Sequence, residues 1–206
     1  MQQRIRLHFS KQGNLCFIGH RDLLRTMERL MRRAQLPLAM SQGFHPKPRV
    51  SYYGALSLGF SSRDEVMEIV LEGEHDVHAV TASLNAASVP GLEFYDPEPL
   101  AGSTSRIKAV SFDYETVIPD RLADGLASKV AGILAAETVP VSKSKGREID
   151  LKRGLLALSF QGGLLYTRLA VQDGPEATMR EVLAALGLGA ELFRSLFPVR
   201  TKTNLA

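Results

Sequence analysis

Apolar and polar residues are arranged along the first part of the chain in a way that predicts a strand followed by a helix. From Arg4 to Phe9 every second residue is apolar, which is typical of a strand with one buried face. From Asp22 to Gln35 the apolar residues recur every three or four positions, as on one face of an α-helix, before Pro37 discourages continuation. We expect the two elements to pack through Ile5, Leu7, Phe9, Leu23, Met27 and Leu30.

The next segment, up to residue 95, predicts further strands and a second helix. Residues 38–60 are interrupted by five Gly and Pro residues, so we expect a structured loop that leads into an extended segment over Val50–Leu56. Val66–Leu71 is apolar like a buried strand, Asp76–Ala87 has helical spacing, and Leu92–Tyr95 is a short strand. The order β-α-β-β-α-β is the ferredoxin-like pattern.

A segment rich in Pro, Gly and Ser, Asp96–Arg106, follows this region and predicts a domain boundary. The elements predicted beyond it are a strand over Val110–Tyr114, a helix over Asp120–Ala136, a hairpin of Leu155–Phe160 and Leu164–Val171 around Gln161-Gly162-Gly163, a helix from Pro175 to Leu186, and a strand over Val199–Thr203. We therefore expect an α+β protein with two ferredoxin-like (β-α-β-β-α-β) halves in tandem, over residues 1–100 and 101–206.

The composition and the absence of known motifs limit which cellular locations and cofactors are compatible with the sequence. The 206 residues are 45% hydrophobic and 23% charged, as in an ordinary folded protein. The first twenty residues lack the apolar core of a signal peptide and no run approaches about 18 apolar residues, so we expect a cytoplasmic protein with no membrane partner. Cys16 is the only cysteine, which excludes a disulfide within the chain and an all-cysteine iron–sulfur cluster. The P-loop, Rossmann and HExxH motifs are also absent, and we expect no metal and no cofactor.

Charge is distributed very unevenly along the chain. Residues 1–53 contain ten Lys and Arg against two Asp and Glu, and residues 54–100 contain one against nine. The balance is therefore +8 in the first segment and −8 in the second, while the whole chain is only +3. A segment this basic attracts polyanions or an acidic partner, unless the acidic segment neutralises it in the fold.

The first predicted helix concentrates much of this positive charge on one side. Arg21, Arg25, Arg29 and Arg32 are spaced by four and three residues, opposite the apolar face, and Arg33 is adjacent. Like charges at these spacings repel each other and destabilise the helix. The arrangement is therefore better explained by an anionic partner than by a contribution to helix stability. The alternative is a solvated helix face paired with the acidic residues of segment 64–76.

A second cluster of candidate residues lies in the loop Ser41-Gln42-Gly43-Phe44-His45-Pro46-Lys47-Pro48-Arg49 and in the Val50-Ser51-Tyr52-Tyr53 segment that follows. Cationic side chains next to aromatic rings on a proline-restrained loop provide phosphate neutralisation and base stacking, as single-stranded RNA requires. Alternatively, the prolines and glycines only shape a turn and the aromatic rings belong to the core. The predicted RNA-binding residues are Arg25, Arg29, Arg32, Arg33, His45, Lys47, Arg49 and Tyr52.

Residues 4–60 also resemble a bacterial protein family. The shared features are Phe9-Ser10-Lys11 in a strand, a helix start Phe17-x-x-His20-x-Asp22-Leu23, and the loop Ser41-Gln42-Gly43-Phe44-His45-Pro46-Lys47-Pro48. This block is similar to the radical SAM-associated (radical SAM-linked) proteins, whose common domain is DUF2344. Members are fused to a radical SAM protein or encoded beside one, so the resemblance implies a radical SAM enzyme as partner. The matched motif positions are His20, Asp22, Ser41, Gln42, Gly43, Phe44, Pro46 and Pro48, and the resemblance implies no catalytic role for them.

The sequence departs from this family pattern at the start of the helix. Gly19 occupies a position where many members have Ser, and Arg21 one where many have Leu. A glycine supplies no side-chain oxygen to the first helical N–H groups, so we expect a weakly capped helix.

The sequence therefore favours a non-catalytic accessory subunit that binds RNA beside a radical SAM enzyme. Two other functions stay open. His20 and His45 could form an acid–base pair for metal-independent RNA cleavage, as in some endoribonucleases of ferredoxin-like fold. The chain could instead be a pure protein–protein interaction module.

Overall fold

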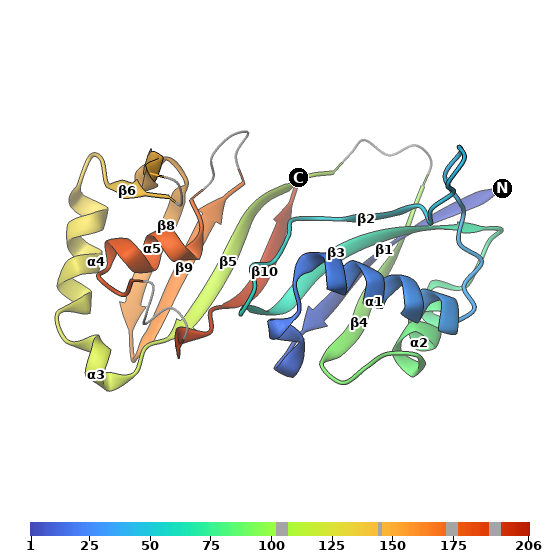
Figure 1. Ribbon diagram of the computed structural model, residues 1–206, viewed down its shortest axis with the longest axis horizontal. Coiled ribbons are helices and arrows are strands. Elements are labelled where there is room, and N and C mark those ends of the chain that lie inside the picture. Colours follow the sequence, from blue (N-terminus) through green and yellow to red (C-terminus); the bar gives the residue numbers. More distant parts are fainter. Residues whose placement is uncertain (102–106, 144–145, 172–176, 190–194) are drawn as a thin grey trace. The chain divides into compact units, whose positions relative to one another are not determined.

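The computed structural model describes residues 1–101, 107–143, 146–171, 177–189 and 195–206. The chain divides into two compact units, Met1–Lys108 and Ala109–Ala206, each with helices and an antiparallel sheet (Figure 1). Within the described ranges, none of the helices is both long and apolar enough to cross a membrane. The protein is thus of the mixed α+β class, as expected from the sequence.

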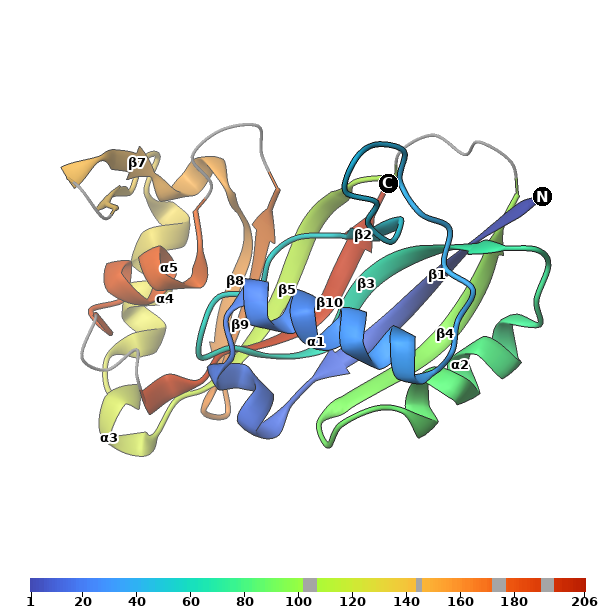
Figure 2. The ribbon, with the colours of Figure 1, turned by 45° about the vertical axis from the view of Figure 1, so that its right-hand side comes forward.

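The first unit alternates strands with two α-helices. Its elements are β1 (Gln2–Lys11), the 3-10 helix η1 (Gly13–Phe17), α1 (His20–Arg33), β2 (Val50–Tyr52), β3 (Ser61–Glu72), α2 (Val77–Ala86) and β4 (Leu92–Leu100). The strands of this unit follow the order β4-β1-β3-β2, and neighbouring strands are antiparallel. Both helices lie on the same face of this part of the sheet (Figure 2).

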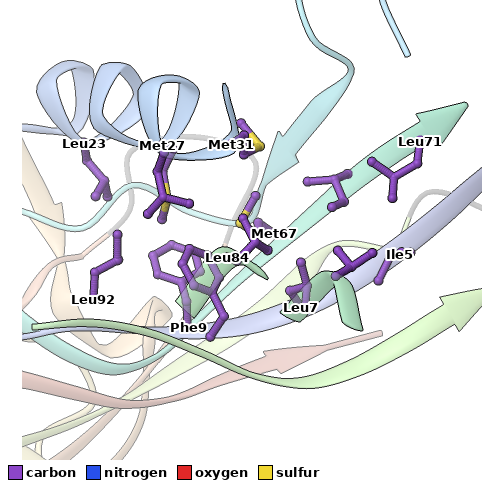
Figure 3. Close-up of a cluster of buried hydrophobic side chains, with 14 residues drawn as sticks. Ile5, Leu7, Phe9, Leu23, Met27, Met31, Met67, Leu71, Leu84 and Leu92 are labelled. Carbon is purple, nitrogen blue, oxygen red and sulfur yellow. The ribbon is translucent and has the colours of Figure 1, made fainter. Parts of the chain in front are cut away.

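The core of the first unit lies between that sheet face and the two helices. Side chains of α1 point toward those of β1 and β3, and Leu84 of α2 joins the same cluster (Figure 3). The predicted packing of the first strand on the first helix is confirmed, because all six predicted contact residues are buried in this cluster: Ile5, Leu7, Phe9, Leu23, Met27 and Leu30. The alternation of β1 then places Arg4, Arg6 and His8 on the opposite face of the sheet.

The segment predicted to contain the domain boundary, Asp96–Arg106, is a strand in its first half, because β4 continues through Asp96 to Leu100. β4 is the last strand in the order, and it pairs along one side with β1. An edge strand tolerates prolines because its outward side needs no N–H donor, which explains Pro97 and Pro99. The register shifts opposite Arg6–His8, where Asp96 adopts a positive φ of 45°. The rest of that segment, 102–106, lies outside the described residues.

The second unit has its own antiparallel strands. Its elements are β5 (Ala109–Val117), α3 (Asp120–Ala123), α4 (Leu126–Ala135), β6 (Pro140–Ser142), β7 (Glu148–Asp150), the 3-10 helix η3 (Leu151–Arg153), β8 (Leu155–Gln161), β9 (Leu164–Ala170), α5 (Met179–Ala185) and β10 (Val199–Leu205). Four of its strands follow the order β10-β5-β9-β8, and β6 pairs separately with β7. The predicted hairpin is confirmed: Gly162 and Gly163 both have positive φ and form the two-residue turn between β8 and β9.

Two helix predictions in the second unit need correction. The single helix predicted over Asp120–Ala136 is divided into α3 and α4, because Gly125 adopts a left-handed conformation with φ 67° that a regular helix cannot contain. The predicted helix start at Pro175 lies outside the described residues. The described α5 begins after Thr178, which forms a capping box with Glu181.

An ion pair across β5 and β9 gives the second unit a testable dependence on pH. Arg168 donates to Asp113 through Nε at 2.6 Å and a terminal nitrogen at 2.8 Å. Burial alone raises the pKa of Asp113, but the hydrogen bonds and charge of Arg168, together with hydrogen bonds from Tyr166 and Asn204, outweigh it and hold the pKa below its usual value. This pair therefore stabilises the fold above the unfolded-state pKa of about 4, and the effect is lost as the pH falls through the lower folded-state value.

Replacing Arg168 with methionine is expected to reduce the free energy of unfolding at neutral pH. The difference in free energy of unfolding between variant and wild type should shrink in acid. Protonation of Asp113 there removes the charge that pairs with Arg168 in the wild type, so the substitution has less to remove. Urea denaturation of both proteins at about pH 7 and about pH 3 measures this. A difference that stays constant across this range would mean that Arg168 acts by packing and not by its charge.

Candidate nucleic-acid interface

Helix α1 places its arginines in solvent because its other side is the core. Leu23, Met27, Leu30 and Met31 are buried under the helix, and Arg21, Arg25, Arg29, Arg32 and Arg33 are exposed. The helix begins after Gly19, whose backbone is extended and which provides no side-chain cap, as the sequence predicts. The expected row of exposed arginines on one helix is therefore present.

The arginines of α1 differ in what they contact. Arg25 lies 3.4 Å from Asp22 one turn earlier, and both side chains are largely exposed, so this ion pair neutralises little. Arg33 donates to the carbonyl oxygen of Ala87 at the end of α2. Across the described residues, Arg21, Arg29 and Arg32 form no side-chain hydrogen bond or ion pair. Three guanidinium groups of α1 are thus exposed and unpaired among the described residues.

The acidic segment does not neutralise α1. Glu68 binds Arg6 at 3.0 Å and lies 3.9 Å from Arg4, both on β1. Asp64 binds His8, also on β1. Asp76 caps α2 by accepting from the backbone N–H of His78. These carboxylates pair with the basic side chains of the neighbouring strand or cap a helix, so internal neutralisation applies to β1 and not to the arginines of α1.

The loop between α1 and β2 carries the second set of predicted residues. All side chains from Ser41 to Lys47 are exposed, as is Arg49, and Phe44 is fully exposed. Arg49 donates to Oε1 of Gln2 at 2.7 Å. The side chains of His45 and Lys47 form no hydrogen bond or ion pair with any described residue. The suggestion that Phe44 belongs to the core is therefore wrong, because residues 41–47 lie outside the packed interior.

The two tyrosines after this loop are in different environments. Tyr52 is half-buried against the core, and its ring meets the ring of His20 edge to face with centroids 6.4 Å apart. Burial, followed by the charge of Glu28, raises the pKa of the Tyr52 phenol. Burial and a hydrogen bond to Glu68 raise the pKa of Tyr53 to about 12. Tyr52 thus presents little of its ring to a ligand, and its role in stacking stays a prediction.

His20 and His45, the proposed acid–base pair, make no direct contact among the described residues. His20 is the first residue of α1 and contacts Tyr52. In the described part of the chain, no side-chain hydrogen bond, ion pair or ring contact connects His45 with His20. Cys16, the single cysteine, is buried in η1 as a small apolar side chain.

Sequence reasoning missed a polar cluster on the sheet face opposite the helices. Nδ1 of His8 lies 2.5 Å from Asp64, and the Tyr95 hydroxyl lies 3.2 Å from the same carboxylate. Arg6 is buried between Glu68 and Glu98, at 3.0 Å from each. The alternation of charges at Arg4, Arg6 and His8 indicated a polar strand face, but the partners follow from the strand register, which the sequence pattern does not reveal.

Comparison with known proteins assigns most of the chain to one protein family. Residues 4–183 match the DUF2344 family, described as an uncharacterized protein conserved in bacteria. No curated protein matches the chain.

Two solved structures align over their lengths but with low similarity. An unknown protein from Galdieria sulphuraria is 13% identical, with 100% of this chain and 98% of that one covered and a TM-score of 0.33. A protein described as a glycine cleavage system transcriptional repressor is 11% identical, with the same coverage and a TM-score of 0.27. Both scores are too low to support an argument about this chain. The family match, in contrast, includes β1, α1 and the loop before β2, and the protein belongs to the DUF2344 family.

Proposed function

We propose that this protein is a non-catalytic accessory subunit that binds RNA and works beside a radical SAM enzyme in the cytoplasm. The observation that supports RNA binding most directly is the set of exposed arginines on α1 without ion-pair partners among the described residues: Arg21, Arg29 and Arg32. Such a set of like charges costs stability in isolation and becomes favourable when phosphates lie against it.

The remaining basic residues of the interface extend this surface beyond the helix. Arg25 is only weakly paired, and His45 and Lys47 are exposed on the following loop. Arg33 and Arg49 each donate one hydrogen bond within the protein and keep exposed guanidinium groups. Such a surface contacts phosphates without reading the base sequence, so it suits general RNA affinity.

We further propose that the two units are tandem ferredoxin-like domains, over residues 1–100 and 101–206. The strand orders β4-β1-β3-β2 and β10-β5-β9-β8 place corresponding strands in the same relative positions. Each unit also has a helix after its first strand and another before its last. The shared order supports an architectural repeat of the β-α-β-β-α-β pattern.

Replacing Arg29 with glutamine is expected to weaken RNA binding without changing stability. The side chain has no partner to lose in the described structure, so the effect should come from one lost phosphate contact. The slope of log affinity against log salt should become shallower by about 0.7, and all single-stranded RNAs should be weakened similarly. Fluorescence anisotropy with a labelled oligonucleotide over a salt series measures both quantities.

The matched control is Arg121→Gln, which removes the same charge from an exposed helical arginine of the second unit. It should leave the salt slope at the wild-type value. Equal effects of the two substitutions would mean that net charge, not the α1 surface, determines binding. Salt-independent binding by the wild type would refute phosphate contacts by this surface. No binding to any RNA tested would refute RNA binding and leave protein–protein interaction as the remaining function.

The proposed partner rests on the family resemblance and needs a separate test. Affinity capture of the tagged protein from its native cell, with bound proteins identified and bound RNA sequenced, addresses both parts of the proposal. A radical SAM protein recovered in stoichiometric amount supports the partnership. Recovery that is unchanged by ribonuclease would show that RNA does not bridge the two proteins.

A further inference from the structure

The loop between α1 and β2 closes on itself as a hairpin over residues 40–48, here called the Phe44 hairpin (Figure 2). Met40 and Pro48 pair as an antiparallel bridge. The backbone N–H of Ser41 donates to the carbonyl of Lys47 at 2.8 Å, and the N–H of Lys47 donates to Oγ of Ser41 at 3.0 Å. These contacts hold the two ends of the segment Gln42–Pro46 together.

The base of the Phe44 hairpin is attached to strand β3. The backbone N–H of Ala39 donates to the carbonyl of Val70 at 2.8 Å, and the N–H of Val70 donates to the carbonyl of Arg49 at 3.0 Å. Ala39 is fully buried. The hairpin is therefore held by the core strand on both sides of its base, although its own side chains are in solvent.

The tip of the hairpin presents one aromatic side chain. Phe44 is fully exposed and follows Gly43, whose φ of 127° is accessible to glycine but strained for other residues. Pro46 and Pro48 fix their own φ angles and limit the freedom of the returning strand. A restrained backbone holds the phenyl ring in water without a covering side chain, which leaves its face available to a planar partner.

The residues that follow Phe44 in the hairpin include three basic ones. His45 and Lys47 are exposed on either side of Pro46, and Arg49 lies at the base. No acidic residue occurs between Gln35 and Phe60. An apolar pocket on a partner protein could accept the phenyl ring but would not use the basic side chains. A nucleotide offers both a base that stacks on the ring and a phosphate that binds the basic side chains.

We propose that Phe44 is a base-stacking residue for single-stranded RNA, with His45 and Lys47 at the adjacent phosphates. The inference rests on the proposed RNA-binding function and deepens it, since it assigns the aromatic contact to Phe44. Base stacking on an exposed ring is tolerant of sequence and adds to phosphate binding without changing its salt dependence.

The test uses the full chain with two fluorescent probes of about twelve nucleotides: single-stranded oligoadenylate and an abasic ribose-phosphate oligomer of equal charge. Phe44→Ala is expected to weaken oligoadenylate binding about tenfold and to leave abasic binding and the salt slope unchanged. Phe44→Leu keeps an apolar side chain without a planar face and should behave like Phe44→Ala. Phe44→Trp should retain binding.

The tryptophan variant also gives a direct signal, because the natural chain has no tryptophan. Stacking on adenine should quench the tryptophan fluorescence, whereas binding of the abasic probe should not.

Equal oligoadenylate affinity for the wild type and Phe44→Ala would overturn the stacking role. RNA binding itself would still be decided by the Arg29→Gln result. Equal weakening of both probes would also overturn the stacking role. Full binding by Phe44→Leu would show an apolar contact without stacking, and no RNA binding by the wild type would overturn both proposals.

Discussion

Glu68→Gln is expected to lower the free energy of unfolding by about 3 kcal/mol, because it removes the buried carboxylate that pairs with the buried guanidinium of Arg6 and leaves only the exposed Glu98 as charged partner. Glu68 and Arg6 each have 9% of their side chain exposed, and Glu68 Oε1 accepts from Arg6 at 3.0 and 3.3 Å. Glutamine has almost the same shape as glutamate, so the change removes charge without creating a cavity. Urea denaturation and the melting temperature measure the loss.

The control for this prediction is Glu98→Gln, which affects the same guanidinium from the solvent side. Glu98 also lies 3.0 Å from Arg6, but 60% of its side chain is exposed. A pair screened by water contributes roughly 0–1 kcal/mol, so this variant should be nearly as stable as the wild type. If the two glutamine variants lose equal stability, burial of Glu68 is not what makes its pair with Arg6 important.

Leu30→Ala is expected to cost roughly 2–5 kcal/mol, through lost burial and the cavity left beneath α1. Leu30 has no exposed surface and belongs to the cluster that joins α1, α2 and the sheet of the first unit. Alanine favours a helix at least as well as leucine, so the loss reports packing and not helix propensity. Chemical denaturation of the purified variant gives the change in free energy.

A leucine on an outer helix face provides the comparison. Leu134 of α4 is 47% exposed, so Leu134→Ala should cost much less than Leu30→Ala. A variant of Leu30 that unfolds at the wild-type urea concentration would contradict the packing of α1 on the sheet. Circular dichroism before denaturation verifies that each variant is folded at the start.

Local periodicity was a sound guide to the elements that bury one face. β1 and α1 were predicted because their apolar residues recur at two and at three to four positions, and burial of that face is what stabilises each element. The predicted bounds Arg4–Phe9 and Asp22–Gln35 differ from the observed ones by a few residues, because end residues are held by hydrogen bonds and caps that periodicity does not report. β4 was predicted too short because its prolines suggested a loop. Prolines are compatible with an edge strand, but the sequence does not show that β4 lies at the edge of the sheet.

The sequence predicted which basic residues belong to the candidate interface, but not which of them would be paired with a carboxylate. The arginines of α1 were placed on one helix side by their spacing alone. Which of them remain unpaired depends on where the acidic segment lies, and Glu68 meets Arg6 only because β1 and β3 pair in a register that places these two residues opposite each other. Similarly, the exposure of Phe44 depends on the hydrogen bonds that hold the hairpin base on β3, and the partial burial of Tyr52 on the pairing of β2 with β3, which no local pattern contains.

The sequence by itself determined the α+β class, the core face of β1 and α1, the positive helix side and the exclusion of an all-cysteine iron–sulfur cluster within the chain. These properties depend on residue type and short spacing, which are written directly in the chain. The tertiary structure alone decided that β1 takes up charges of the acidic segment, that Arg21, Arg29 and Arg32 have no ion-pair partner among the described residues, and that Phe44 stands in solvent. The reason is that pairing and exposure depend on contacts between residues far apart in the chain, such as the 62 positions that separate Arg6 from Glu68.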